Sequence, residues 1–343
     1  MPRVPPLLSI LLPVYNAAAT LPRCLASLRA QTLEDWELIA VDDGSSDASP
    51  ALLKEAARRD PRILFIAQAH AGVVAAANRA RSYSSGHYIA RMDADDEAAP
   101  ERLAQQVARL EADASLDFAS CLVRFGGDGR AQGGFARHVD WINSVITPAE
   151  HVLAQFLEFP LANPTLCGRG AAWERAGDYA EGDFPEDYVW FLRAMERGLR
   201  FAKVEAELLT WHDPPARLTR TDRRYRVEAF FTAKLPFLTR WLQREVKGGR
   251  PLYVWGAGRR TRQRLRPLRT AGTALAGWVD IDRRKIGGVA DGLPVIRPED
   301  LLAGPGPRPF ILPAVRSRGA GTTIATWLEE NGFHAGEDYL LLA

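Results

Sequence analysis

Four short apolar runs, separated by segments of helical character, constrain the fold of this chain more than any other feature of the sequence. The runs read SILLPVY, ELIAVDD, ILFIA and HYIARM and occupy residues 9–15, 37–43, 63–67 and 87–92. Helices are predicted between them; in the first, residues 20–30, apolar side chains recur at i, i+3, i+4 and i+7. Strands that alternate with helices of this length indicate a doubly wound, mostly parallel α/β sheet.

Two acidic clusters lie where strands of this sheet are expected to end. Asp42 and Asp43 finish one apolar run, and the sequence DADD (93–96) follows another. In doubly wound sheets, ligands bind beyond the carboxyl ends of the strands. Carboxylates there suit a hard divalent cation, which offsets the charge of a diphosphate leaving group. Acids are also common in turns and helix caps, so Asp42 is equally a candidate turn residue and Asp96 a candidate cap for the next helix.

The ordered motifs of residues 7–215 resemble glycosyltransferase family 2. They are PVYN (13–16), VDDGSSD (41–47), Asn78 with Gly86, YIARMDADD (88–96), PERLAQQ (100–106), NPT (163–165) and PEDYVWFLRA (185–194). The resemblance implies the GT-A fold, a nucleoside-diphosphate sugar as donor, Mg²⁺ or Mn²⁺ as cofactor and inversion at the anomeric carbon. The implied reaction moves a sugar, most simply from a UDP-sugar, to an acceptor hydroxyl in bacterial surface polysaccharide assembly.

The resemblance also implies roles for individual residues. Those expected to contact the donor are Pro13, Val14, Tyr15, Asp43, Asn78, Asp93 and Arg220, with Asp43 accepting the N3–H of uracil. Those expected at the metal are Asp95, Asp93 and His212, although a lone histidine is as often structural. Asp187 is expected to be the general base, and Glu186 to orient the acceptor or a neighbouring side chain. Acids at 186 and 187 also suit the first turn of a helix.

The sequence departs from the family at two positions. Many relatives carry a basic residue where Ala77 stands, so a cation on that side must come from Arg79, Arg81 or Arg91. Relatives also often have histidine where Asn163 stands. Neither change removes the expected metal ligand or base.

Three parts of the chain are predicted. Residues 1–220 form the GT-A domain, residues 221–249 a helical linker that ends at two glycines, and residues 250–343 a smaller Rossmann-like accessory domain. In the last part VWGAG (254–258) and Asp280 are similar to a dinucleotide fingerprint. The third glycine is absent and the segment has the length of one mononucleotide-binding half, so scaffolding, oligomerisation or nucleotide sensing is expected.

Two other functions stay open at this point. A non-catalytic nucleotide-sugar-binding protein would share the motifs, although the presence of Asp95 and Asp187 argues against it. An NAD-dependent oxidoreductase would use the accessory domain, and the missing glycine argues against that.

The composition narrows the cellular setting. No window has the ~18 consecutive apolar residues of a membrane-spanning helix, and the amino-terminal run reads as a strand rather than a signal peptide. The widely spaced Cys24, Cys121 and Cys167 form neither a disulfide framework nor a zinc pattern, which favours a cytoplasmic, soluble protein.

The basic residues are gathered in two runs and are mostly arginine. Only five of the 44 are lysine, and the runs are RLTRTDRRYR (217–226) and RRTRQRLRPLR (259–269). Each run is either a solvated helix face or a surface for phosphates, an acidic glycan or an anionic membrane. No nucleic-acid motif contains them, so no nucleic-acid partner is expected. The expected partners are the donor and a glycan or lipid-linked acceptor; peripheral attachment to the inner membrane face and a homodimer through the accessory domain stay open.

Overall fold

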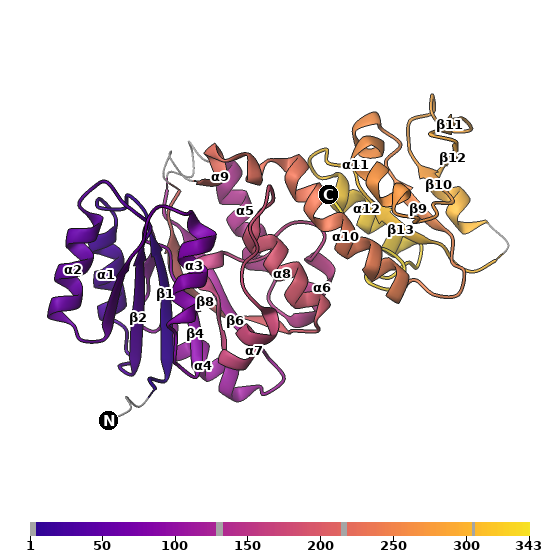
Figure 1. The fold of residues 1–343 in the computed structure, drawn as a ribbon. Coiled ribbons are helices and arrows are strands. Elements are labelled where there is room, and N and C mark those ends of the chain that lie inside the picture. Colours follow the sequence, from indigo (N-terminus) through magenta and orange to yellow (C-terminus); the bar gives the residue numbers. More distant parts are fainter. Residues whose placement is uncertain (1–4, 128–132, 214–217, 304–305) are drawn as a thin grey trace. The chain divides into compact units, whose positions relative to one another are not determined.

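The computed structural model of the chain describes residues 5–127, 133–213, 218–303 and 306–343. The chain forms two compact units, whose elements are labelled in Figure 1. The first unit comprises Met1–His151, Pro160–Gly182 and Val189–Thr221, and the second comprises Val152–Phe159, Asp183–Tyr188 and Asp222–Ala343. The division lies after Thr221, and the sequence predicts the GT-A domain to end at residue 220. Two short pieces from earlier in the chain nevertheless belong to the second unit.

The first unit is built on an eight-stranded sheet with the strand order β3-β2-β1-β4-β7-β6-β8-β5. Its first four strands are parallel to one another: β1 (Leu8–Val14), β2 (Trp36–Asp42), β3 (Ile63–Ala67) and β4 (Tyr88–Arg91). The four strands predicted from the apolar runs are therefore confirmed, each within one residue at either end.

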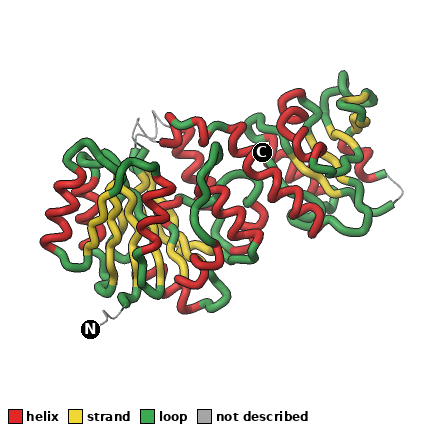
Figure 2. Tube along the Cα trace, viewed as in Figure 1, coloured by secondary structure: helices red, strands yellow, loops and turns green. Residues whose placement is uncertain are grey.

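Amphipathic helices cover the sheet, and Figure 2 shows them in red beside the yellow strands. They are α1 (Leu21–Arg29), α2 (Ser49–Arg59), α3 (Val73–Ser82) and α4 (Arg102–Ala112). Helix α1 buries Leu21, Cys24, Leu25 and Leu28, the four positions that its periodicity predicts. The hydrophobic core of the unit forms where these helix faces meet the sheet.

The other half of the sheet contains antiparallel pairs. Strand β7 is antiparallel to both β4 and β6, and β5 is antiparallel to β8. The strands are β5 (Glu97–Ala98), β6 (Phe118–Phe125), β7 (Cys167–Arg169) and β8 (Phe201–Trp211). The helices of this half are α5 (Gly133–Ser144), α6 (Pro148–Ala154), η1 (Asn163–Thr165), α7 (Gly170–Ala176), α8 (Glu186–Glu196) and α9 (Leu218–Thr221).

All three cysteines lie in the core of the first unit as free thiols. Burial raises the pKa of Cys121 to about 11 and that of Cys167 to about 12. Burial, together with the carboxylates of Asp96 and Asp93, also raises the pKa of Cys24. The three thiols are therefore held in the neutral form.

The second unit contains a smaller α/β sheet with the strand order β11-β12-β10-β9-β13. Strands β13, β9, β10 and β12 are parallel, as expected for a Rossmann-like unit, and β11 is antiparallel to β12. The strands are β9 (Leu252–Trp255), β10 (Gly277–Val279), β11 (Val289–Ala290), β12 (Leu293–Ile296) and β13 (Phe310–Pro313). The helices are η2 (Arg223–Tyr225), α10 (Val227–Glu245), α11 (Arg259–Thr270), η3 (Pro298–Leu302) and α12 (Ala320–Glu330).

Helix α10, which the sequence assigns to a linker, is part of the second unit and holds it together through a buried lysine. The ammonium of Lys234 donates to the carbonyl oxygens of Phe156 at 2.6 Å and Leu342 at 2.7 Å. Burial lowers the pKa of Lys234 to about 7. These bonds explain why residues 152–159 group with the second unit. In the part of the chain described here, no helix has the length and apolarity to cross a membrane.

The buried lysine predicts a pH dependence of stability. Between pH 7 and the ordinary range of a lysine pKa, the unfolded chain binds more protons at residue 234 than the folded chain, so the free energy of unfolding rises with pH. The free energy of unfolding of the wild type, relative to that of Lys234→Met, should rise by up to about 1.4 kcal/mol per pH unit across pH 7–9. Urea unfolding at pH 7 and at pH 9 measures this rise. Lys247→Met, at an exposed lysine, is the control. Parallel pH curves for wild type and Lys234→Met contradict it.

Candidate functional site

Three adjacent strands bring the predicted donor-binding residues to one edge of the first sheet. Strand β1 lies between β2 and β4 and is parallel to both. Pro13 and Val14 end β1, Tyr15 and Asp43 directly follow β1 and β2, and Asp93 stands two residues beyond β4. The side chain of Val14 is buried in the core, so only its backbone belongs to the edge.

Tyr15 and Asp43 are linked by His70, a residue for which the sequence predicts no role. The rings of Tyr15 and His70 stack with centroids 4.2 Å apart and 25° between their planes. The Nδ1 of His70 lies 2.8 Å from the Oδ2 of Asp43. Because Tyr15 is half exposed and Asp43 is buried, the stacked pair forms a platform whose underside is anchored to the sheet. Such platforms bind the flat face of a nucleobase.

The carboxylate of Asp43 is fully used by the protein. Its Oδ1 accepts hydrogen bonds from the Nε2 of Gln68 at 2.6 Å and from the backbone N–H of Ala71 at 2.9 Å. Its Oδ2 accepts one from the N–H of Gly72 at 2.8 Å, besides its contact with His70. For Asp43 to accept the N3–H of uracil, as predicted, one donor must leave, and the Gln68 amide is the one borne by a flexible side chain.

The turn after Asp43 brings the His70 loop close. Asp42 accepts the backbone N–H of Ser45 at 3.3 Å, which confirms its interpretation as a turn residue. Gly44 has a φ of 73°, and a Cβ at this position would lie 2.7 Å from the backbone nitrogen of His70. Glycine is therefore needed here both for its backbone conformation and for the close approach of the loop.

Arg91 is the arginine that contacts an acid of this edge. Its Nη2 lies 3.1 Å from the Oδ1 of Asp93, and its side chain is buried. The Nε and Nη1 atoms of Arg91 have no hydrogen-bond partner among the described residues. Arg81 is held instead by two carboxylates of the segment 174–178, and Arg79 is exposed.

Asp96 binds a neighbouring strand end instead of capping a helix. Its carboxylate accepts the backbone N–H of His212 at 2.9 Å and is buried. The interpretation of Asp96 as a helix cap is wrong, because the short strand β5 intervenes and α4 begins only at Arg102, with Glu101 as its N-cap.

His212, an expected metal ligand, is engaged on both sides of its ring. Its Nε2 lies 2.9 Å from the Oε1 of Glu97, and its Nδ1 lies 3.1 Å from the carbonyl oxygen of Gly126. Both partners are hydrogen-bond acceptors, so in this arrangement each ring nitrogen of His212 faces a protein oxygen.

The donor chemistry for a metal rests on two carboxylates. No group of three or more His, Cys, Asp or Glu side chains that could hold a metal occurs in the described part of the chain, so Asp93, Asp95 and His212 do not form a three-ligand centre. Mg²⁺ is commonly bound by one or two carboxylates together with substrate phosphates. Asp93, with 32% of its side chain exposed, and Asp95 fit that pattern. The backbone carbonyl of Asp95 is fixed by the Nη2 of Arg23 at 2.8 Å.

Asn78 clamps a backbone segment. Its Nδ2 donates to the carbonyl oxygen of Tyr179 and its Oδ1 accepts the N–H of the same residue, both at 2.9 Å. The hydroxyl of Tyr179 lies 3.1 Å from the Oδ1 of Asn163. The Asn78 and NPT motifs are thus connected through Tyr179, and the Asn78 amide supports the site through the backbone.

Arg220 forms an ion pair with the buried carboxylate of Asp213. This pair fixes one guanidinium nitrogen while 45% of the arginine side chain stays exposed. Arg217, a second arginine considered for the diphosphate, lies outside the described residues.

The two expected catalytic acids begin helix α8 and belong to the second unit. The carboxylate of Glu186 is buried, and the hydroxyl of Tyr225 lies 2.8 Å from both of its oxygens. Burial, followed by the charges of Glu186 and Asp187, raises the pKa of Tyr225, which keeps its phenol as a donor. The Nη1 of Arg224 lies 3.9 Å from the Oε2 of Glu186. Asp187 is less buried and accepts the backbone N–H of Tyr188 at 2.7 Å.

The fingerprint-like acid of the second unit is committed to its own loop. Asp280 accepts hydrogen bonds from the N–H of Ala257 at 3.0 Å, the N–H of Asp282 at 2.9 Å and the ammonium of Lys285 at 2.8 Å. An acid that binds a ribose needs free acceptor capacity. This geometry gives no support to the oxidoreductase alternative.

Comparison with known sequences supports the resemblance. The family model for glycosyl transferase family 2 matches residues 9–156. Glycosyltransferase GlyA of Streptococcus pneumoniae is 42% identical over 89 residues, which cover 26% of this chain and 13% of GlyA. Chondroitin synthase of Escherichia coli is 36% identical over 111 residues, 32% of this chain and 16% of the synthase. The chain thus spans well under two thirds of these relatives.

The structural comparison identifies the fold. The 1–349 fragment of Staphylococcus aureus TarS, solved with UDP-GlcNAc, superposes with a TM-score of 0.55 at 18% identity, over 68% of this chain and 66% of the fragment. The likeness extends to the large, mostly parallel sheet that carries the candidate site. Residues 9–156 of this chain therefore match the model of glycosyl transferase family 2, and the chain has the GT-A fold.

Proposed function

We propose that this chain catalyses the inverting transfer of a sugar from a UDP-sugar to an acceptor hydroxyl. One observation carries the proposal: the adjacent carboxyl ends of β2, β1 and β4 hold an aromatic platform, Asp43 and the pair Asp93–Asp95. These groups suit a nucleoside diphosphate: the platform and Asp43 suit its base, and the pair Asp93–Asp95 suits its ribose and its metal-bound diphosphate. The presence of UDP-GlcNAc in the TarS fragment supports the donor class, and the glycan synthases among the relatives support a glycan acceptor.

The donor contacts follow from the chemistry of the edge. The base stacks on Tyr15, and its N3–H reaches Asp43 after the Gln68 amide has turned away. Asp93, held by Arg91, accepts a ribose hydroxyl or a metal-bound water. Arg220 binds the diphosphate through its exposed guanidinium nitrogens.

A divalent cation belongs to this proposal. Asp95 would hold it, with Asp93 beside it, and bound Mg²⁺ or Mn²⁺ would offset the charge of the leaving diphosphate. His212 would bind the cation directly only if its Nε2 left the Glu97 carboxylate.

The reaction is a single displacement. The carboxylate of Asp187 takes the proton of the acceptor hydroxyl, and the acceptor oxygen forms a bond to the anomeric carbon. The bond from that carbon to the diphosphate oxygen breaks, and the nucleoside diphosphate leaves with the electron pair. Glu186 is the less suitable base because its carboxylate is buried and holds Tyr225. We assign it the task of orienting the start of α8.

The proposal is tested by a panel of nucleotide sugars. Thermal-shift measurements with UDP-glucose, UDP-GlcNAc and GDP-mannose, with and without Mn²⁺, should show stabilisation by a UDP-sugar that depends on the metal. Release of UDP from the stabilising donor should follow. Binding without any turnover, in water or with glycan acceptors, would favour the non-catalytic alternative, and no binding by any donor would reject both.

Replacing the base separates the two acids of α8. Asp187→Asn should lower the rate of UDP release about 10²–10⁴-fold, as loss of a positioned base does, while donor affinity stays unchanged. Glu186→Gln, which keeps the shape of its side chain and one acceptor oxygen for Tyr225, is the matched control and should lower the rate of UDP release much less. A reversed order of the two variants would transfer the role of base to Glu186.

Replacing Asp95 tests the metal assignment. Asp95→Asn should abolish the Mn²⁺-dependent part of the donor stabilisation, because a neutral amide binds a hard cation weakly. Glu101→Gln removes an equal charge from an exposed position nearby and should leave that part intact. Full Mn²⁺ dependence in Asp95→Asn would show that the cation is held elsewhere.

The contact between Tyr225 and Glu186 predicts a loss of stability. Tyr225→Phe removes a donor from a buried carboxylate and should lower the free energy of unfolding by about 1–3 kcal/mol. Tyr83→Phe, at a half-exposed tyrosine, should change it little. Urea unfolding of both variants measures the difference; equal values would mean that the Tyr225 hydroxyl does not hold Glu186.

A further inference from the structure

A basic groove runs along helix α11 in the second unit, outside the donor edge. Its arginines stand at i, i+3, i+7 and i+10 and so share one face of the helix: Arg259, Arg262, Arg266 and Arg269. Together with Gln263 and Asp291 they line a hollow of about 360 Å³. A second hollow of about 550 Å³ adjoins it and shares Arg266 and Arg269. The groove is therefore continuous over the length of the helix.

The charges of the groove are unbalanced. Asp291 is the one acid among the described residues that line it. Its carboxylate pairs with Arg262 and, at 4.0 Å, with the Nη1 of Arg269, and its carbonyl oxygen accepts a hydrogen bond from the Nη2 of Arg269 at 3.0 Å. Arg259 and Arg266 make no hydrogen bond or ion pair to a described residue. Arg264, on another face of α11, is by contrast paired with Glu228 at 3.1 Å. The groove thus holds cations that the second unit does not neutralise.

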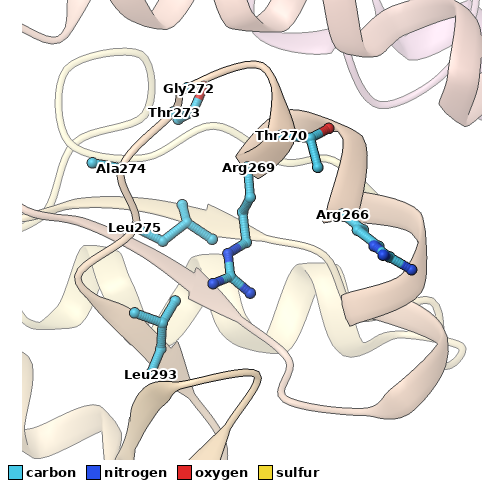
Figure 3. A pocket seen from close by; sticks show the side chains of 8 residues that line it. All are labelled: Arg266, Arg269, Thr270, Gly272, Thr273, Ala274, Leu275 and Leu293. Carbon is cyan, nitrogen blue, oxygen red and sulfur yellow. The ribbon is translucent and has the colours of Figure 1, made fainter.

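The larger hollow has an apolar floor. Figure 3 shows the Arg269 side chain descending from the helix on the side of Leu275 and Leu293, while the guanidinium of Arg266 points away from these leucines. The Oγ1 of Thr273, in the loop before β10, is buried without a hydrogen-bond partner among the described residues. One hollow therefore combines apolar surface with arginine at the rim.

We propose that this groove binds a small organic phosphate, such as a sugar phosphate. Arginine guanidinium groups bind phosphate oxygens through paired, charge-assisted hydrogen bonds. The phosphate would lie against Arg266 and Arg269, and the organic body would lie over Leu275 and Leu293. A cavity of about 550 Å³ is of the size that holds small-molecule ligands.

The site differs from the one that the glycine-rich sequence suggests. VWGAG (254–258) includes the carboxyl end of β9, where a dinucleotide would bind, and Asp280 there is occupied. Besides the two arginines, the larger hollow is lined by Thr270, residues 272–275 and Leu293, which precede or begin the parallel strands β10 and β12. It therefore lies at the opposite, amino edge of this sheet. The proposal does not depend on the assigned transfer reaction.

The test uses the full chain with two probes, inorganic pyrophosphate and glucose 1-phosphate, titrated by calorimetry in EDTA. Both probes should bind the wild type. The single variant Arg266→Gln and the double variant Arg266→Gln/Arg269→Gln should each lower the affinity for both probes by about tenfold or more, as expected for loss of charge-assisted bonds. Arg284→Gln is the matched control, since its side chain is 91% exposed and pairs only within its own turn. Because Arg266 makes no hydrogen bond or ion pair to a described residue, the variant Arg266→Gln should fold normally.

A further variant tests the apolar floor. Leu293→Ser should weaken the binding of glucose 1-phosphate and leave the binding of pyrophosphate unchanged. If each probe binds this variant as tightly as it binds the wild type, the proposal of an organic ligand is rejected. The proposal also fails if neither probe binds at millimolar concentration, or if Arg284→Gln weakens binding as much as Arg266→Gln. Binding to phosphatidylglycerol vesicles that is lost in Arg266→Gln, without binding of either probe, would assign the groove to a membrane surface instead.

Discussion

The parallel pairing of β1 with β2 on one side and β4 on the other is the constraint on which the candidate donor site depends. Because parallel strands end at the same edge, Tyr15, Asp43 and Asp93 meet there. Asp43 is 28 positions from Tyr15 in the chain, and Asp93 is 50 positions from Asp43. The loop that carries His70 is then drawn in by the Asp43 carboxylate. The edge is thus assembled by backbone topology first, and side-chain hydrogen bonds fix it afterwards.

Much of this arrangement can be predicted from the sequence, because the first four strands are continuous apolar runs and their helices have clear periodicity. The runs also end at or just before the acids, so the sequence alone assigns Asp43 and Asp93 to the strand tips. The role of Asp42 in its turn follows from the GSSD sequence. The local pattern and the global fold agree in this half of the chain.

The rest depends on contacts that no local pattern encodes. Strand β8 carries charged residues and β7 has only three residues, so neither has the signature of a buried strand. The helix-cap prediction for Asp96 fails because a two-residue strand separates this residue from the next helix. His70 follows the third strand at the same edge, and that position is the one signal in the sequence that could reveal it. The bond between Tyr225 and Glu186 joins segments that are 39 residues apart.

The state of the three cysteines has a practical consequence for chemical labelling. Maleimides and disulfide reagents attack the thiolate at accessible positions, and Cys24, Cys121 and Cys167 offer neither accessibility nor ready ionisation. A single cysteine introduced on the surface will therefore react alone against a silent background. The native thiols can stay in place, and dyes or spin labels can be attached to either unit of an otherwise unaltered chain.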